Sequence, residues 1–144
     1  NGSQPYGDSG PVFRPHEGGI PGLARDNPEA QLVDQYVSWV AERARFGHNY
    51  LRPERLFVDL FDLTNWRLIE AKASEARKEL RMAIGQLLDY RRYYPGRSPS
   101  LAVLLRHRPS SGKVRMLTDN RITVIWRTPS GRFTPKRWQE ERGS

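Results

Sequence analysis

The sequence contains no cysteine, and this absence excludes disulfides and thiolate metal sites. It has no run of about 18 apolar residues, so we expect no membrane-spanning helix. No charged and then apolar leader precedes the first periodic segment, so no signal peptide is expected. These absences favour a cytoplasmic protein. The chain begins with Asn-Gly-Ser instead of methionine, and we expect it to be part of a longer protein.

Lysine is scarce, since 20 of the 24 basic residues are arginine, the side chain best shaped to pair with phosphate. The charge is also uneven along the chain. Residues 1–71 carry 7 basic and 10 acidic side chains, a net charge of −3, whereas residues 72–144 carry 17 and 6, a net charge of +11. A basic surface kept only for solubility is one explanation. A cationic half beside an acidic half favours a polyanionic partner, and nucleic acid leads.

The chain of 144 residues is long enough for one domain. Residues 1–26 hold six glycines and four prolines without an apolar period, and we expect a flexible arm or linker there. Residues 27–128 carry the periodic segments and are predicted to form the domain. Residues 129–144 are basic and are predicted to be a peripheral tail.

The periodic segments predict an α/β fold in the order α-β-β-α-β-(α)-β, with a mixed sheet flanked by helices. Asn27 as cap and Pro28 as first helical residue mark a clear helix start. The expected elements are a helix from 28 to about 46, strands at 55–61 and 66–73, a helix from 74 to 94, a strand at 100–107, a short helix or loop at 110–120, and a strand at 121–128.

The hairpin between the first two strands places charges in an otherwise apolar pattern. If Thr64 and Asn65 form its turn, Asp59 lies directly across from Glu70, and Lys72 lies on the same face two residues further on. Two opposed carboxylates repel by up to about 1 kcal/mol, which a divalent cation between them would reverse. A solvated sheet face with a Glu–Lys pair is the alternative.

The helix predicted after the hairpin carries Gln86 and Tyr90 four residues apart, on one face. The opposite stripe is expected to face the core, and its members are Leu80, Ile84, Leu87 and Leu88.

A helix, a hairpin ending in Ile-Glu-Ala-Lys, and a helix containing Ala-Ile-Gly-Gln-Leu-Leu-Asp-Tyr resemble the PD-(D/E)XK nuclease superfamily, and within it the RecB-like branch with its Gln-x-x-x-Tyr motif. The likeness covers residues 29 to about 127 and implies a restriction-endonuclease-like core. Glu70 and Lys72 fill the E-x-K positions. The motif aspartate is then Asp59, although Val58 stands where the motif has proline; this leaves Asp62 as a competitor, on the other face.

The resemblance implies a Mg²⁺ cofactor, for which Mn²⁺ can substitute. Its ligands would be Asp59, Glu70 and the main-chain carbonyl of Ala71, all hard oxygen donors of the kind Mg²⁺ prefers. An acidic residue on the first helix often completes such a site, and Glu29 is the best match.

The resemblance also implies roles for the other motif residues. Lys72 would orient or deprotonate the attacking water and stabilise the charge on the attacked phosphorus. Gln86 and Tyr90 would orient active-site groups. Five basic residues of the second helix are candidates for contact with the DNA backbone, with a solvated helix face as the alternative: Arg77, Lys78, Arg81, Arg91 and Arg92.

These features together predict a Mg²⁺-dependent endodeoxyribonuclease, the cleavage module of a bacterial restriction-modification or defence protein. Its expected partners are DNA and a target-recognition domain or subunit outside this chain, and a homodimer is a further option. The alternatives are an RNA-cleaving toxin-type nuclease on the same fold and a nucleic-acid-binding module without catalysis. Trp126, Phe133 and Trp138 could stack on bases, but burial is the stronger expectation for them.

Overall fold

The computed structural model of the chain describes residues 12–15, 27–41, 46–51, 56–57 and 60–136. Its helices are α1 (Pro28–Val40), α2 (Arg77–Arg91) and α3 (Ser111–Thr118). Its strands are β1 (Val12–Pro15), β2 (Phe46–Leu51), β3 (Leu56–Phe57), β4 (Leu60–Asp62), β5 (Arg67–Lys72), β6 (Ser100–Leu105), β7 (Ile122–Arg127) and β8 (Phe133–Lys136). The fold class is α/β, as the sequence predicts.

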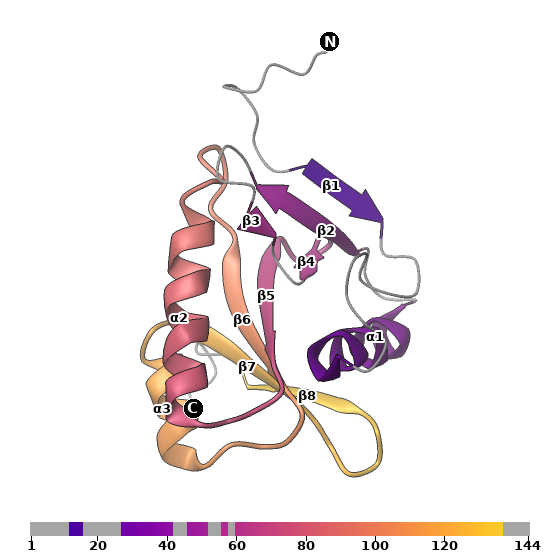
Figure 1. The fold of residues 1–144 in the computed structure, drawn as a ribbon, viewed down its shortest axis with the longest axis vertical. Coiled ribbons are helices and arrows are strands. Elements are labelled where there is room, and N and C mark those ends of the chain that lie inside the picture. Colours follow the sequence, from indigo (N-terminus) through magenta and orange to yellow (C-terminus); the bar gives the residue numbers. More distant parts are fainter. Residues whose placement is uncertain (1–11, 16–26, 42–45, 52–55, 58–59, 137–144) are drawn as a thin grey trace.

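The eight strands of the described residues form one mixed sheet (Figure 1). Their order across the sheet is β1-β2-β4-β5-β6-β7-β8, and β3 pairs with β2 beside this path. β5, β6 and β7 run parallel to one another, and every other pair is antiparallel. Parallel neighbours need a crossover connection, which α2 provides between β5 and β6 and α3 between β6 and β7. The three parallel strands therefore end at one edge of the sheet.

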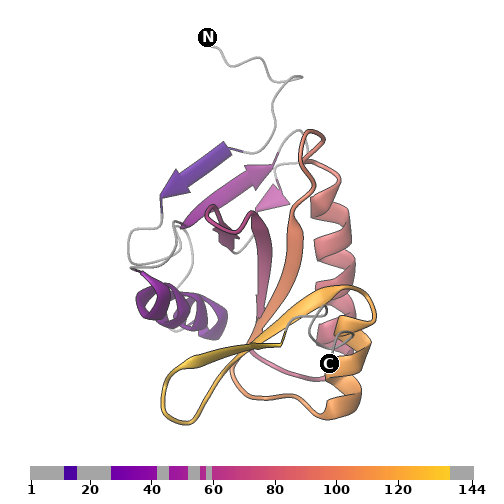
Figure 2. The same cartoon turned by 180° about the vertical axis from the view of Figure 1, so that it is seen from behind.

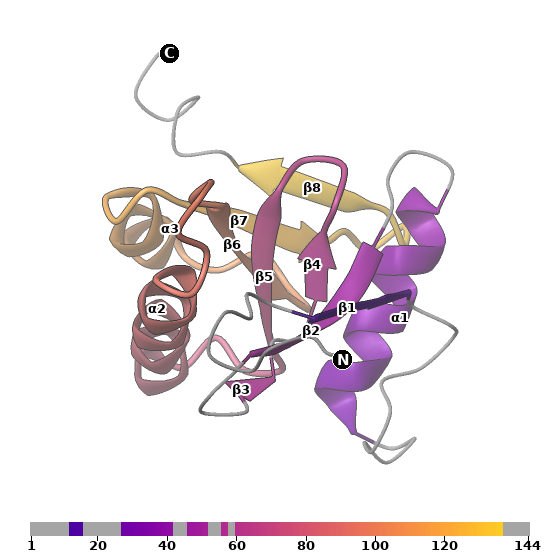
Figure 3. The same ribbon diagram turned by 90° about the horizontal axis from the view of Figure 1, so that it is seen from above.

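The helices cover both faces of the sheet, with α1 on one side and α2 and α3 on the other (Figure 2 and Figure 3). The buried residues on the α1 side include Leu32, Val33, Leu60, Ile69, Ala71, Leu104 and Ile125. Those on the α2 side include Phe61, Leu68, Leu80, Leu87, Leu105, Leu117 and Val124. Each fully buried large apolar side chain contributes about 1.5–3 kcal/mol. None of the described helices is long and apolar enough to cross a membrane.

Helix α1 begins where the sequence predicts. The side-chain oxygen of Asn27 accepts hydrogen bonds from Glu29 N (2.9 Å) and Ala30 N (3.0 Å), which satisfies two donors at the helix start. The predicted end near Phe46 is wrong, because α1 ends at Val40 and β2 starts at Phe46. β2 pairs with β1 and β4, and such pairing between distant segments leaves no local pattern to detect.

The β4–β5 hairpin has the register that the sequence predicts. Leu60 pairs with Ile69, and Asp62 pairs with Arg67. The turn between them ends at Trp66, whose φ of 54° is unusual for a bulky side chain. Its indole Nε1 donates to Arg97 O at 2.8 Å. Its ring packs edge-on against Phe61 with the centroids 4.7 Å apart. These contacts offset the backbone strain.

Helix α2 faces the sheet with a stripe slightly different from the predicted one. Its buried residues are Leu80, Ala83, Leu87 and Tyr90. The expectation for Leu88 is wrong, since that side chain is 41% exposed. The spacing of three, four and three residues brings Ala83 and Tyr90 onto the buried face instead. The helix also starts at Arg77, later than the predicted start at residue 74.

The sheet extends beyond the domain limits that the sequence predicts. β1 lies within the expected arm and pairs with β2, and β8 lies within the expected tail and pairs with β7. Phe133 of β8 is only 4% exposed and contacts Tyr36 edge-on, with a centroid distance of 5.2 Å. The segment from 129 to 136 therefore belongs to the folded domain.

Candidate functional site

Glu70 and Lys72 lie side by side near the carboxyl end of β5. Their residues are 6% and 7% exposed, and Lys72 Nζ lies 3.8 Å from Glu70 Oε2. Alternation along the strand sets them on the same side as Leu68, which belongs to the core under α2. The two motif residues thus form a buried ion pair whose separation is longer than a hydrogen bond.

The position of the third motif residue, Asp59, lies outside the described residues. The register of the β4–β5 hairpin is nevertheless settled by three consecutive pairs, the first of which joins Leu60 to Ile69. The placement of Asp59 across from Glu70 stays a prediction.

Asp62, the competitor for the motif aspartate, serves the hairpin turn. Its Oδ1 accepts hydrogen bonds from Thr64 N and Asn65 N, both at 3.0 Å, and its Oδ2 accepts from Asn65 Nδ2 at 2.8 Å. Both oxygens are therefore engaged by the turn. Alternation with Phe61 sets Asp62 on the α1 side of the sheet, away from Glu70.

The buried phenol of Tyr36 lies on the same side as Asp62. Burial raises the pKa of Tyr36 to about 12; among its charged neighbours, Arg67 lowers this pKa and Asp62 raises it. The hydroxyl thus stays neutral at physiological pH. This side of the sheet holds a structural polar cluster, separate from the Glu70–Lys72 pair.

Gln86 and Tyr90, the predicted motif pair of α2, lie in different surroundings. Tyr90 is buried in the core on the α2 side. The Oε1 atom of Gln86 is buried and accepts no hydrogen bond from any described residue. A buried unsatisfied acceptor is rare in folded proteins and calls for an explanation such as a functional role.

Glu29 reaches the end of the same strand from the other side of the sheet. Its Oε2 accepts a hydrogen bond from Ala73 N at 3.2 Å, directly after Lys72. In the part of the chain that the structure describes, no three His, Cys, Asp or Glu side chains are grouped so as to hold a metal ion. Among the predicted ligands, that part supplies Glu70, Glu29 and the carbonyl of Ala71.

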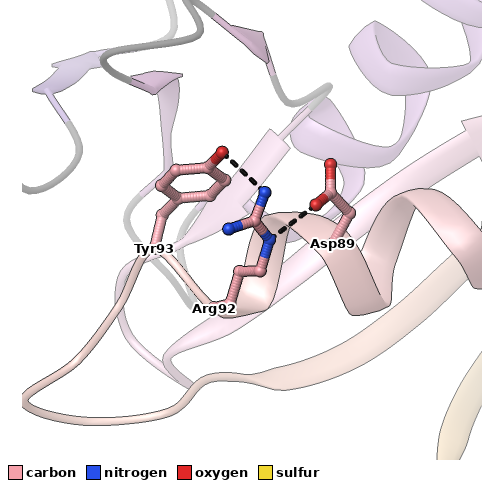
Figure 4. Close-up of polar contacts among 3 residues, drawn as sticks. All are labelled: Asp89, Arg92 and Tyr93. Carbon is pink, nitrogen blue, oxygen red and sulfur yellow. Dashed lines mark hydrogen bonds and ion pairs between the residues drawn. The ribbon is translucent and has the colours of Figure 1, made fainter.

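The predicted DNA-contacting residues of α2 differ in exposure. Arg77, Lys78 and Arg81 are exposed, and Arg91 is half-buried. Arg92 is held at the end of the helix (Figure 4): its Nε donates to Asp89 Oδ1 at 2.7 Å and its Nη2 to Tyr93 Oη at 2.9 Å. An exposed pair of this kind is weak, and a contact of Arg92 with DNA stays a prediction.

The sequence reasoning missed a group of basic residues at the carboxyl ends of β6 and β7. Arg106, His107 and Arg108 directly follow β6, and Arg127 ends β7. They line a cavity of about 690 Å³ together with Trp126, Thr128 and Pro129. Ligands of open α/β sheets bind beyond the carboxyl ends of the strands. Basic residues that directly follow the mostly apolar runs of 101–105 and 122–126 were the available signal.

The arrangement brings a buried carboxylate–ammonium pair and a basic cavity to the same edge of the sheet. Such a set can bind an anion and act on it by acid–base or metal-assisted chemistry. No protein-family model, curated protein or solved structure matches the chain.

Proposed function

We propose that the chain is a Mg²⁺-dependent DNA endonuclease domain of the PD-(D/E)XK superfamily, with a restriction-endonuclease-like core. The observation that carries the proposal is the Glu70–Lys72 pair, which is buried in the sheet with 3.8 Å between its charged atoms. Burial of a charge costs free energy unless a partner of opposite charge offsets it, so buried charged pairs are often retained for function. A strand that places both charges next to a basic edge of the sheet suits phosphodiester hydrolysis.

The order of elements gives further support. The resemblance rests on a helix, a hairpin and a second helix, and the chain has α1, the β4–β5 hairpin and α2 in that order. Glu70 and Lys72 end the hairpin, and Gln86 lies on the helix that packs against it. The Oε1 atom of Gln86 accepts no hydrogen bond from the described residues, as expected for a group that binds a substrate or a water.

The residues at the end of β5 fit a hard divalent cation in their chemistry. Glu70 supplies a buried carboxylate and Ala71 a main-chain carbonyl, whereas the carboxylate of Glu29 meets the strand end from the opposite side of the sheet. Asp59 would complete the set if the hairpin register continues by one pair. When bound, Mg²⁺ would lower the pKa of a ligated water and offset the charge that develops on the phosphate.

The chain's own groups would do the rest. Glu70 would hold the ion, and burial would keep its carboxylate in one orientation. Lys72, fixed beside it, would donate hydrogen bonds to a phosphate oxygen or orient the attacking water. The amide oxygen of Gln86 would accept a hydrogen bond from a donor in the site, such as the attacking water, and so orient it. The net charge of +11 on residues 72–144 would attract the polyanion.

Recognition of bases would come from outside this chain. Both long helices pack on the sheet, α1 on one face and α2 on the other, so neither is free to enter a groove. We therefore propose a target-recognition domain or subunit as partner, within a bacterial restriction or defence system. Mapping the ends that the chain produces by sequencing tests this: cuts should show little sequence preference, and a sharp recognition sequence would contradict it.

The test of the activity uses plasmid DNA and an RNA transcript of the same sequence, each with Mg²⁺, Mn²⁺ or EDTA. We expect metal-dependent cutting of DNA, lost in Glu70→Gln and Lys72→Met. The matched controls are Lys113→Met on α3 and Asp119→Asn directly after it, which change the same charges and should cut like the wild type. Cutting of RNA alone would support the toxin-type alternative, and binding without cutting would support the non-catalytic one.

A second readout does not depend on cleavage. Mg²⁺ that binds only the folded state raises the melting temperature. The rise should be present in the wild type and in Asp119→Asn and absent in Glu70→Gln. An equal rise in all three would show that Glu70 does not hold the ion.

A further inference from the structure

The cavity at the carboxyl ends of β6 and β7 has the size and lining of a nucleotide site. Its volume of about 690 Å³ falls within the range of small-molecule pockets, about 300–1,000 Å³. Three arginines and a tryptophan dominate the lining, namely Arg106, Arg108, Arg127 and Trp126. No acidic residue takes part in it.

The three arginines are exposed, and in the described part of the chain none of them forms an ion pair with a carboxylate. Arg106 and Arg127 also line a smaller cavity of about 130 Å³ beside α1. Arginines that are close together without acidic partners repel one another, and a phosphate between them would remove that repulsion. A solvated basic rim is the alternative, and only a test that controls for charge separates the two.

Trp126 distinguishes this cavity from an ordinary basic patch. Its ring is half-buried and packs against the core on the α2 side, which fixes its orientation. Arg108 lies over the ring with its guanidinium carbon 5.7 Å from the centroid, near the outer limit of about 6 Å for a cation–π contact. A base could take the place of the exposed Arg108 on the ring, and such stacking does not depend on the identity of the base.

The register ties the cavity to the candidate catalytic pair. Leu105 of β6 pairs with Lys72 on one side and with Trp126 on the other. Residues paired across a sheet point to the same face, so the side chains of Lys72 and Trp126 leave the sheet in the same direction. Neighbouring strands are about 4.8 Å apart, which separates the two residues by roughly 10 Å, a distance that one strand of nucleic acid spans easily.

We propose that this cavity binds an unpaired nucleotide of the substrate strand next to the scissile bond. The base stacks on Trp126, and the neighbouring phosphates pair with Arg106 and Arg127. The position next to the scissile bond rests on the proposed function, whereas binding of the nucleotide does not depend on catalysis. The proposal implies that the substrate has a single-stranded or locally opened segment and that the chain prefers it to a regular duplex.

The test measures binding in EDTA, so that no cleavage takes place. Fluorescence anisotropy follows labelled oligothymidine, oligouridine and a DNA duplex of the same length, bound to the wild type and to Arg106→Ala/Arg127→Ala. The matched control is Lys113→Ala/Arg115→Ala on α3, which loses the same charge outside the cavity. We expect the cavity variant to bind the single strand at least about tenfold more weakly. The slope of log K against log salt should fall by about 1.4 for two lost phosphate contacts. The control should change neither.

The aromatic part is tested with Trp126→Leu and Trp126→Phe, both checked by circular dichroism. The leucine variant should lose at least about fivefold in single-strand affinity, and the phenylalanine variant should keep most of it because it still stacks. Equal losses in the cavity variant and the α3 control, or an equal loss for duplex and single strand, would overturn the proposal. If the cavity residues are needed for single-strand binding but the chain cleaves no nucleic acid, the binding site is supported and the nuclease function is refuted. Affinity for oligouridine but not for oligothymidine would support the site and show that its ligand is RNA.

Discussion

Lys72 Nζ lies 3.8 Å from Glu70 Oε2 within the sheet, and both side chains are more than nine-tenths buried. A buried pair of this kind is stable mainly because neither charge is left alone, since an unpaired buried charge costs about 3–5 kcal/mol. The pair therefore links the stability of the domain to the residues proposed for catalysis.

Removal of one charge should be worse than removal of both. We expect Glu70→Gln and Lys72→Met each to lower the free energy of unfolding by about 3 kcal/mol in EDTA. The double variant should recover most of that loss, because it leaves no lone charge. Urea denaturation measures all four proteins. Additive losses in the double variant would show that the two side chains do not interact.

Asp62 should matter for stability and not for chemistry. Asp62→Ala leaves the amides of Thr64 and Asn65 without their acceptor, and we expect a loss of about 1–3 kcal/mol. Asp62→Asn keeps an oxygen at Oδ1 and should lose less. The cleavage rate per folded molecule, measured below the melting temperature of each variant, should equal that of the wild type. Loss of cleavage in a folded Asp62→Asn protein would make Asp62 the motif aspartate after all.

Part of this fold and site was open to prediction from the sequence, because it depends on local patterns. Asn27 and Pro28 mark the start of α1, and a short turn fixes the register of the β4–β5 hairpin. The same alternation separates Asp62 from Glu70. Each of these features depends on residues only a few positions apart.

The features that were missed depend on contacts between distant segments. β2 was not expected as a strand, since its pairing with β1 and β4 leaves no local trace. Phe133 is one of two aromatics in a basic segment, and the packing of β8 on α1 buries it. Arg106 and Arg127 come together because β6 and β7 are parallel neighbours, which the order of the elements does not determine.

The pKa of Tyr36 predicts a loss of stability in alkali. Below pH 10 this phenol is protonated in both the folded and the unfolded chain. Between pH 10 and about pH 12 the unfolded chain releases the proton while the folded chain keeps it, so the free energy of unfolding falls by about 1.4 kcal/mol per pH unit. Tyr36→Phe should remove this slope, and urea denaturation at several pH values in the window compares the two. The other tyrosines are common to both proteins, so equal slopes would show that the pKa of Tyr36 is not raised.

Gln86 offers a test in which stability and function move in opposite directions. Its Oε1 is buried and accepts no hydrogen bond from the described residues, so the folded chain keeps an unsatisfied acceptor at a cost of about 1–3 kcal/mol. Gln86→Met has a similar volume and no acceptor, and it should be as stable as the wild type or up to about 1 kcal/mol more stable. If the amide serves the reaction, the same variant should cut DNA at least about tenfold more slowly. Ser38→Ala, which removes an exposed polar side chain from α1, is the control for handling and should alter neither quantity much. A destabilised Gln86→Met protein would mean that the amide is satisfied in the folded chain, and a stable variant that cuts at the wild-type rate would remove Gln86 from the proposed site.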